Sequence, residues 1–365
     1  MEKLKILQIV PSLSLSNGVA AYLENYYKNM DLTKFETTIL VLNDDNKGRY
    51  EAFKALGCKI IEFYKSESFG KYLKKVDKLF KDNQFDIIHC HTPNYGAFFM
   101  HYAKKHGVIS RILHSHANKY ADTKINAIRN FPLFKFAVLN SNKYLACSKI
   151  AGDFLFKKRE YLVINNAIEL LAFKFDLNKR EKLRNELKLE DKYVIGEFGR
   201  LCPQKNQLFT IDIFYEIYKK KEDARLLLIG DGALENDIRK KVSEYGLEEK
   251  VIILNSKSNI CDYYNCLDMF LLPSTYEGLG IVLIEAQANS LPCYTSLDRV
   301  PKLAKISPLL KYLDLNDGAS KWADCIMNDN DNVRKDYYEE ILNSDFNIKN
   351  EAKKLEEFYI SSVNA

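Results

Sequence analysis

The sequence predicts an α/β protein made of two doubly wound, parallel-sheet domains in tandem. Its 365 residues are enough for two domains of ordinary size, and 47% hydrophobic with 28% charged residues is typical of a soluble globular chain. Short β-rich runs alternate with helix-length stretches in both halves of the chain. This alternation indicates βαβ units and therefore parallel sheets.

The first domain is expected over residues 1–168. Its β-rich runs are residues 4–10, 36–42, 58–63, 86–91, 111–116, 143–148 and 160–165. Helical spacing separates these runs, as a parallel sheet with crossover helices requires. A polar segment at residues 166–190 then interrupts the pattern, which indicates a domain junction.

The second domain is expected over residues 169–345. Its β-rich runs are residues 193–200, 224–232, 251–255, 268–274 and 291–296. Residues 346–365 have the spacing of an amphipathic helix, which we expect to join the first domain. Because doubly wound folds bind ligands at the carboxyl ends of their strands, we expect a ligand cleft between the domains.

Composition restricts the function classes. A net charge of +5 with a pI near 8.5 is a mild bias toward anionic partners, and no Lys/Arg block interleaved with aromatics makes nucleic acid an expected partner. No apolar run reaches about 18 residues, and the first strand is too short for a signal peptide, so a cytoplasmic location is expected. The eight cysteines are scattered and are expected to be reduced thiols.

Two turns have the composition of phosphate-binding loops. Gly199, Arg200 and Lys205 lie between a β-rich run and an amphipathic helix, where two cations and free helix amides could receive a diphosphate. Gly18 follows a Ser-rich loop and precedes another helix. The alternatives are solvated loop cations in the first case and an ordinary strand-to-helix turn in the second. For Gly230 in a third turn, with Gly232 beside it, an ordinary turn is the preferred interpretation.

Two carboxylates stand in the apolar stretch "PSTYEGLGIVLIEAQANSLP". Glu277 is expected in a turn, and Glu285 in a helix that begins near Gly280. Because the neighbours of Glu285 are largely apolar, its carboxylate is expected to accept hydrogen bonds, for which sugar hydroxyls are natural donors. The alternative is that Glu277 caps a helix and Glu285 is solvated.

All six histidines fall between residues 89 and 116. Alternation along a strand places His89 with His91, and His114 with His116, on one face. Three interpretations remain open: a metal site, buried or capping histidines, and a single active-site histidine at a strand end. Cys90 is expected on the opposite face, so no further ligand completes a metal site.

The chain resembles the retaining glycosyltransferases of family 4, which have the GT-B fold and nucleotide-sugar donors. The resemblance covers most of the sequence and rests on "GVAAYLENYY", "DIIHCHTPNYGAFF", "RILHSHAN", "YLACSKIAGDFLF", "VINNAIE", "GRLCPQKNQ", "LLLIGDG", "LLPSTYEGLGIVLIEAQANSLP" and "KKLEEFY". The second and third stretches are most similar to enzymes that build capsules and exopolysaccharides. The chain departs from the family pattern at Asn17, where a double glycine is frequent, and at Gly280 in "EGLG".

The resemblance implies roles for individual residues. Arg200 and Lys205 correspond to the donor-diphosphate ligands, Glu285 to the ribose ligand, and Glu277 to the residue that holds the donor sugar. The remaining donor-binding positions are Gly18, Gly199, Ser258, Ile260, Leu279, Gly280 and Ile281. The nucleobase would lie near Ser258 to Ile260. The expected catalytic group is His116, Glu277, Arg200 and Lys205, with no metal and no cofactor.

The resemblance therefore implies a retaining, metal-independent hexosyltransferase. It would move a hexose or N-acetylhexosamine from a nucleotide sugar, preferably a UDP-sugar, to a lipid-linked bacterial surface glycan. The alternatives are a GT-B epimerase or hydrolase of nucleotide sugars, and a non-catalytic sugar-nucleotide-binding partner in capsule assembly. Basic and aromatic residues at 128–136 are consistent with contact to the inner face of the membrane, or with an ordinary amphipathic helix.

Overall fold

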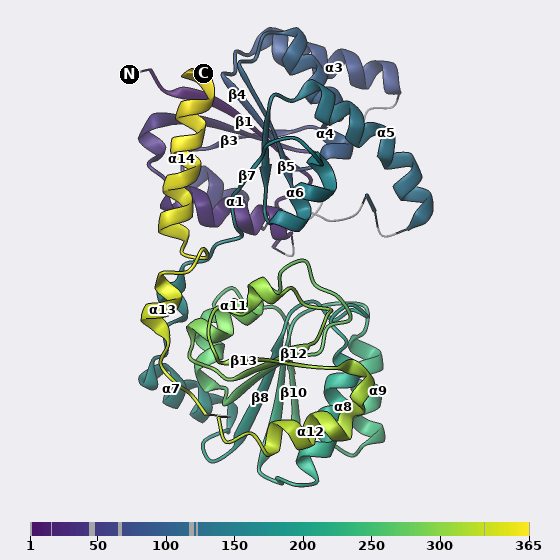
Figure 1. The fold of residues 1–365 in the computed structure, drawn as a ribbon, viewed down its shortest axis with the longest axis vertical. Coiled ribbons are helices and arrows are strands. Elements are labelled where there is room, and N and C mark those ends of the chain that lie inside the picture. The colour runs from purple at the N-terminus through teal and green to yellow at the C-terminus, as the bar shows by residue number, and fades with distance from the viewer. Residues whose placement is uncertain are drawn as a thin grey trace. The chain divides into compact units, whose positions relative to one another are not determined.

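The computed structural model describes residues 2–15, 17–43, 48–64, 68–116, 120–121, 123–331 and 333–364. Its contacts divide the chain into two compact units (Figure 1). Unit 1 is Met1–Ala167 with Ile348–Ala365, and unit 2 is Ile168–Asn347. The boundaries predicted from the sequence lie within two residues of these.

Unit 1 contains a seven-stranded sheet in the order β3-β2-β1-β4-β5-β6-β7, with every neighbouring pair parallel. Strand β1 lies between β2 and β4, so the strand order reverses there. The strands are β1 (Leu4–Val10), β2 (Phe35–Val41), β3 (Lys59–Glu62), β4 (Ile87–Cys90), β5 (Ser110–Ser115), β6 (Lys143–Ala146) and β7 (Leu162–Val163). All seven predicted runs therefore form strands.

Helices cover both faces of this sheet, because alternate strand residues are apolar on each side. Ile6 and Val10 face one layer, and Leu7 and Ile9 face the other. The first layer contains α1 (Gly18–Asn29), α2 (Tyr50–Ala55) and α14 (Ile348–Asn364), and the second contains α3 (Phe69–Asp82), α4 (Pro93–Lys105), α5 (Lys124–Asn140) and α6 (Lys149–Phe156).

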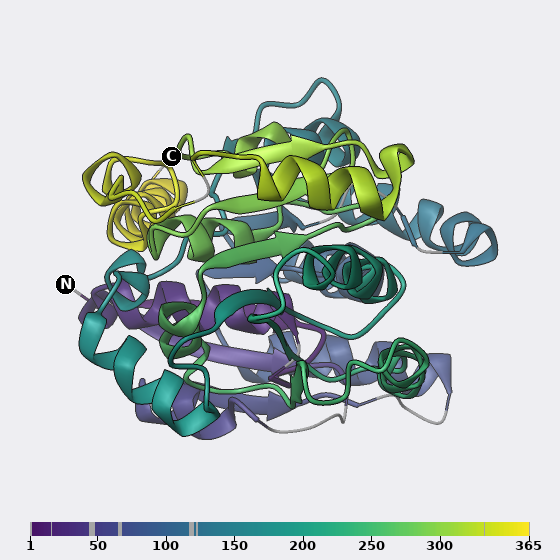
Figure 2. The ribbon, with the colours of Figure 1, turned by 90° about the horizontal axis from the view of Figure 1, so that it is seen from below.

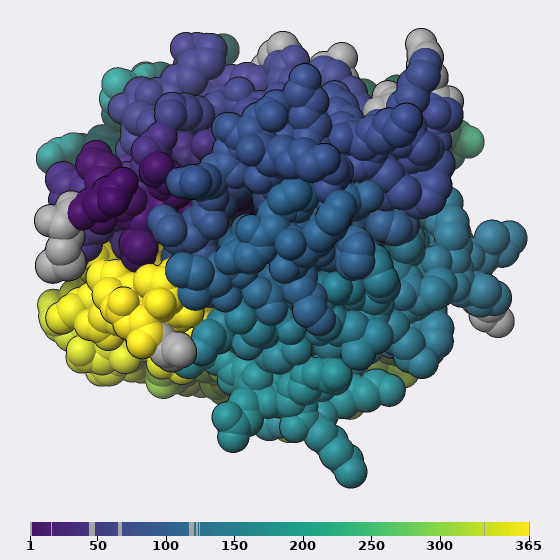
Figure 3. All heavy atoms as spheres, turned by 90° about the horizontal axis from the view of Figure 1, so that it is seen from above, coloured from purple at the N-terminus to yellow at the C-terminus, as the bar shows by residue number. Residues whose placement is uncertain are grey.

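The predicted C-terminal helix is present as α14 and belongs to unit 1. Its Glu351 carboxylate accepts a hydrogen bond from the Asn165 backbone N–H at 2.7 Å, and its Glu356 carboxylate accepts one from the Asp31 backbone N–H at 2.7 Å. In Figure 3 the C-terminal residues (yellow) lie directly beside the N-terminal ones (purple) on the surface of this unit. The end of the chain therefore completes the core begun by its first strand.

Unit 2 contains a six-stranded parallel sheet in the order β10-β9-β8-β11-β12-β13. The strands are β8 (Tyr193–Phe198), β9 (Ala224–Ile229), β10 (Val251–Leu254), β11 (Met269–Leu272), β12 (Cys293–Ser296) and β13 (Leu310–Leu313). The prediction of five strands was wrong by one, because β13 was missed. That strand is short, carries Lys311, and lies at the sheet edge with three of its four residues half-buried, so its pattern is weak.

One face of the second sheet packs against α8 (Gln207–Tyr218), α9 (Glu235–Glu244) and α12 (Gly318–Met327), as Figure 2 also shows. The other face packs against α7 (Leu177–Leu187), α10 (Ile260–Tyr263), α11 (Ile281–Ala288) and α13 (Tyr338–Leu342). Short 3-10 turns occupy Leu32–Lys34, Leu170–Phe173, Tyr264–Cys266, Lys302–Ala304 and Leu315–Asp317. The predicted pair of doubly wound parallel sheets is confirmed.

Strand order also shows where each unit can hold a ligand. In unit 2 it reverses at β8, which lies between β9 and β11. At such a point the loops after neighbouring strands run to opposite faces and leave a crevice at the carboxyl ends. The candidate ligand-binding loops are therefore those that follow β8 and β11 in unit 2, and those that follow β1, β4 and β5 in unit 1.

Candidate active site

In unit 2 the loops after β8 and β11 bring Lys205 and Glu277 together. The Lys205 Nζ atom lies 2.8 Å from Oε1 of Glu277, and the two side chains are only 13% and 7% exposed. The Ser274 hydroxyl donates to the same carboxylate at 2.6 Å. Between the loops, the Thr275 N–H donates to the carbonyl oxygen of Gln204 at 2.8 Å, which fixes their spacing.

Glycines allow the loops after β8 and β9 to approach each other closely. A Cβ atom on Gly199 would lie 3.3 Å from Cε of Lys205, so the lysine passes close over that backbone. A Cβ on Gly230 would lie 1.9 Å from the carbonyl oxygen of Gly199, and one on Gly232 would lie 2.2 Å from that of Leu201. Gly230 and Gly232 therefore admit the backbone of the neighbouring β8 loop, which is a packing role and leaves their interpretation as an ordinary turn in place.

Arg200 does not join the pair. It is exposed, and its only described hydrogen bond is through its carbonyl oxygen, which accepts from Nε2 of Gln207 at 2.9 Å. Ser258 is also exposed, and Ile260 is half-buried at the start of α10. Within the described ranges, no hydrogen bond or ion pair joins these residues to Lys205 or Glu277.

Glu285 lies on α11, the predicted helix after the "EGLG" turn. The helix begins directly after Gly280, whose φ of +82° is in the left-handed region that favours glycine. Leu279 and Ile281 flank that residue. The Leu283 N–H donates to the Gly280 carbonyl oxygen at 2.9 Å, and the amides of Ile281 and Val282 have no acceptor among the described residues. The Tyr264 hydroxyl donates to the Glu285 carboxylate at 2.6 Å. Burial raises the pKa of Glu285, although Tyr264 and the charge of Lys205 oppose the shift.

Glu197 was not singled out by the sequence reasoning. It is the last polar residue of β8 and is buried close to Lys205 and Glu277. Burial raises its pKa to about 8, with Thr210 and Lys205 acting in the opposite direction. The available signal was a charged residue within the otherwise apolar run "YVIGEF". At neutral pH the folded protein therefore holds a proton on this carboxyl.

Replacing Glu197 with glutamine is expected to weaken the pH dependence of stability. Between about pH 5 and 8 the folded state binds a proton that the unfolded state has lost, so the contribution of this group to wild-type stability is lost as pH rises through that range. The amide does not titrate. Urea unfolding across this range should give a shallower fall for Glu197→Gln than for wild type. Glu249→Gln, at an exposed carboxylate, is the matched control, and equal slopes for all three proteins would contradict the prediction.

In unit 1 the histidines of β4 and β5 meet on one face of the sheet. His89 Nε2 lies 3.1 Å from His114 Nδ1, and His91 Nδ1 lies 2.9 Å from His116 Nε2. Burial lowers the pKa of all four, to about 3 for His116, so they are neutral near pH 7. Cys90 packs in the layer on the other face, as predicted from alternation.

The ring geometry favours hydrogen bonds over a shared metal ion. His89 and His114 are within 3° of parallel, and their centroids are 5.2 Å apart. With the facing nitrogens 3.1 Å apart, the rings meet edge to edge, so their in-plane lone pairs point at one another and not at a common third point. His89, His91 and His114 do bring one nitrogen each within 4.8 Å of the others. This ring alignment is the one expected for N–H···N hydrogen bonds between neighbouring imidazoles.

Gly18 and His116 are the predicted site residues of unit 1. Gly18 is the first residue of α1, and the Asn17 side chain caps that helix by accepting from the Ala20 N–H at 3.0 Å. His116 directly follows β5. No hydrogen bond between the two is found in the part of the chain that the structure describes.

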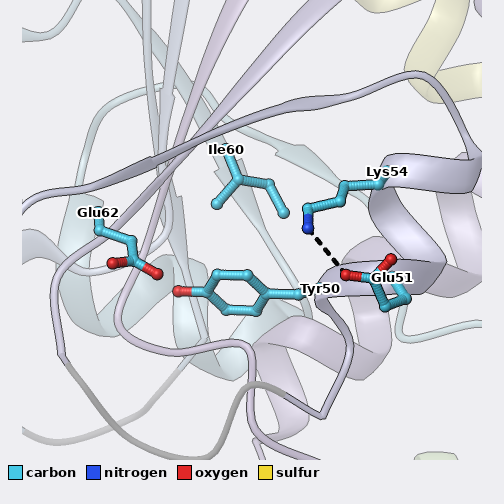
Figure 4. A pocket seen from close by; sticks show the side chains of 5 residues that line it. All are labelled: Tyr50, Glu51, Lys54, Ile60 and Glu62. Atoms are coloured by element: carbon cyan, nitrogen blue, oxygen red, sulfur yellow. Dashed lines mark hydrogen bonds and ion pairs between the residues drawn. The ribbon is translucent and has the colours of Figure 1, made fainter.

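A separate hollow of about 370 Å³ lies on unit 1, beside α2 and β3 (Figure 4). Tyr50, Glu51, Lys54, Ile60 and Glu62 line it. The Lys54 ammonium pairs with the Glu51 carboxylate at 2.8 Å. None of the predicted site residues lines this hollow, so it is not the predicted site.

Comparison with known proteins identifies the fold family. Residues 16–170 match the family described as Glycosyltransferase Family 4, and residues 178–302 match that of the group 1 glycosyl transferases. The chain is a glycosyltransferase with the GT-B fold. Each match lies almost entirely within one of the two units.

Relatives of this glycosyltransferase include proteins named as bacterial glycosyltransferases. It is 28% identical over 338 residues to the glycosyltransferase EpsF of Bacillus subtilis, covering 88% of the chain and 86% of EpsF. It is 27% identical over 237 residues to the UDP-Gal:alpha-D-GlcNAc-diphosphoundecaprenol alpha-1,3-galactosyltransferase of Escherichia coli, covering 62% and 61%. The structure of Anabaena HepE with UDP and glucose has a TM-score of 0.78 at 17% identity, covering 98% of this chain and all of that one. The last likeness concerns the fold alone.

Proposed function

We propose that this glycosyltransferase moves a hexose or N-acetylhexosamine from a UDP-sugar to a growing, lipid-linked bacterial surface glycan, with retention of configuration and without a metal. The observation that carries the proposal is the buried Lys205–Glu277 pair at the β8/β11 crevice, with Glu285 on the next helix. The E. coli relative is named for a UDP-sugar donor, a diphosphoundecaprenol acceptor and an alpha linkage. These names support the donor, the acceptor class and retention.

The residues of unit 2 are suited to a diphosphate leaving group. Glycosyl transfer develops positive charge at the sugar and negative charge on the departing diphosphate. The Lys205 ammonium and the free amides of Ile281 and Val282 in α11 would stabilise that negative charge, and Arg200, which is exposed, would contact it from the loop. Glu277 would accept from sugar hydroxyls and Glu285 from ribose hydroxyls. Ser258 and Ile260 would lie along the nucleobase.

One set of assays tests the proposal against its alternatives. Purified full-length protein is incubated with UDP- and GDP-sugars, with and without a diphosphoundecaprenol-linked saccharide, and the products are weighed by mass spectrometry. Transfer to the acceptor, with the donor's anomeric configuration kept in the product, is expected. Conversion of the donor without acceptor would indicate the epimerase or hydrolase, and no turnover of any donor would indicate a binding partner.

Contact with the inner face of the membrane is part of the proposal. Along α5, Ile125, Ile128, Pro132, Lys135 and Leu139 form one exposed stripe at helical spacing, and the two isoleucines are 82% and 76% exposed. An apolar stripe with basic neighbours is suited to an anionic lipid surface. No helix in the described ranges has the length and apolar character to cross a bilayer.

The double variant Ile125→Ser/Ile128→Ser is expected to lose most binding to anionic vesicles. Removing two exposed apolar side chains deletes the part that would enter the lipid interface, while the folded core is untouched. Co-sedimentation with vesicles containing phosphatidylglycerol measures the effect. Leu177→Ser, at a residue that is 57% exposed on α7 of unit 2, is the control. Equal sedimentation of both variants and wild type would argue against the stripe.

A further inference from the structure

Two residues far apart in the chain complete the histidine cluster of unit 1. Gln8 on β1 and Tyr359 on α14 are both fully buried beside β4 and β5. The Gln8 amide lies 2.9 Å from the hydroxyls of Tyr27 and Tyr359, and its oxygen side lies 2.9 Å from His91 Nε2. The Tyr359 hydroxyl lies 2.6 Å from His89 Nδ1.

The number of partners fixes the orientation of the Gln8 amide. Two tyrosine oxygens face one end of the amide, and a single imidazole nitrogen faces the other. With Nε2 toward the tyrosines, both of its N–H groups have acceptors and Oε1 accepts from His91. With the amide turned over, one N–H would be left without a partner at a fully buried position, which costs free energy. Nε2 therefore faces the tyrosines.

This orientation determines the proton positions on the His89 branch. Tyr359 accepts from Gln8, so its own proton goes to His89 Nδ1. His89 then carries its proton on Nε2 and donates to His114 Nδ1. His114 Nε2 is buried without a hydrogen-bond partner among the described residues, and the Tyr22 ring packs against this imidazole at 87° with centroids 5.4 Å apart. The hydrogen bonds of the His89 branch therefore end at His114, inside the core.

The His91 branch ends at the predicted site. Because Gln8 Oε1 can only accept, His91 carries its proton on Nε2 and its Nδ1 is an acceptor. His116 must then donate from Nε2. We propose that Gln8 is a positioning residue which, through His91, holds His116 with a bare Nδ1 that accepts a hydrogen bond from a hydroxyl of the bound sugar or glycan acceptor.

The hydrogen-bond relay from Gln8 through His91 to His116 requires neutral imidazole rings. An additional proton on His91 would go to Nδ1 and face the Nε2–H of His116, and one on His116 would occupy its bare Nδ1. Burial opposes both charges by lowering the pKa of the two residues. His116 therefore selects a ligand group by its ability to donate a hydrogen bond. The bare nitrogen attracts a hydroxyl donor and repels phosphate and carbonyl oxygens. The inference rests on the proposed function for the identity of the ligand, but the tautomer of His116 does not depend on it.

Nuclear magnetic resonance of the full chain tests the tautomer directly. Nitrogen-15-labelled histidine in wild-type protein, observed through two-bond proton–nitrogen couplings at neutral pH without ligand, should show His116 and His91 as Nε2–H tautomers. His101 and His106 on and beside α4, outside the relay, serve as internal references. An Nδ1–H tautomer, or an average of both tautomers, at His116 would overturn the inference. Because wild-type protein is used, the test does not depend on a variant's folding.

Substitutions at His116 separate a positioning role from a packing role. Asparagine places an oxygen near the former Nδ1, whereas glutamine places an amide N–H near the former Nε2 and keeps the bond to His91. We expect kcat/KM for His116→Asn to exceed that of His116→Gln by about tenfold. The opposite order would mean that the bond to His91 matters and the acceptor does not.

Substitution of Gln8 completes the test. Gln8→Met, of similar length, should mix the His116 tautomers in the spectrum and lower kcat/KM by about tenfold. A folded Gln8→Met protein with an unchanged His116 signal would overturn the role of Gln8. If no sugar is transferred while the wild-type spectrum is as expected, the proposed function fails and the relay stands. If transfer occurs and His116 carries its proton on Nδ1, the relay fails alone.

Discussion

Lys205→Met is expected to lower kcat/KM for sugar transfer by about 10²–10³-fold, because it removes a preorganised cation from the place where the leaving diphosphate gains charge. Lys205 is the buried cation of the β8/β11 crevice, held by the Glu277 carboxylate at 2.8 Å. The loss should appear in single-turnover rates, measured with enzyme in excess over the donor and with saturating acceptor, which report on the chemical step.

The same change should also destabilise the protein. Without Lys205, the buried Glu277 carboxylate is left without its cation, which typically costs about 3–5 kcal/mol. The double variant Lys205→Met/Glu277→Gln removes that charge and should recover most of the stability without recovering transfer. Lys240→Met, at an exposed lysine of α9, controls for loss of positive charge. A folded Lys205→Met protein with transfer close to wild type would refute the assignment of Lys205.

Glu285→Gln is expected to weaken UDP binding by about 10–100-fold, since an ionised carboxylate accepts hydroxyl hydrogen bonds more strongly than an amide. Stability should not fall, because burial raises the pKa of Glu285, and so the protein gains little from its charged form. Calorimetric titration with UDP and urea unfolding measure the two quantities separately.

The pH dependence of UDP binding gives a second readout of Glu285. Its affinity contribution requires the ionised form, so binding should weaken as pH falls through the raised pKa, and this dependence should vanish in Glu285→Gln. Tyr264→Phe is the matched variant. It removes the hydroxyl that lowers the Glu285 pKa, so the fall in affinity should move to higher pH. A pH profile that is identical in wild type and Glu285→Gln would show that Glu285 does not bind the ribose.

Most strands could be predicted from the sequence, because buried parallel strands are continuous apolar runs. The first strand was predicted with both of its ends correct at Leu4–Val10. Strand β13 could not be predicted, since an edge strand of four residues with one buried position lacks a continuous apolar run. The turn at Glu277 and the helix at Glu285 followed from Pro and Gly positions, which act locally.

The contacts of the candidate site were less predictable. Glu277 and Lys205 were expected to bind the same donor, and the structure adds that they pair directly. Arg200 was grouped with Lys205 by its position in the loop, yet a loop side chain has rotamers that sequence does not determine, and it is exposed. The same-face placement of the histidines followed from alternation. Their partners did not, because Gln8 and Tyr359 are 351 positions apart in the chain.

The place of α14 in unit 1 constrains the order in which the protein can mature during synthesis. Unit 2 is translated before α14, so it can fold while unit 1 still lacks a helix over one face of its sheet. Until then Gln8 and His89 have no Tyr359 to bond. Unit 1 therefore acquires its final histidine geometry only when the C-terminal helix docks. Nascent chains stalled before residue 348 should expose that face to chaperones and proteases.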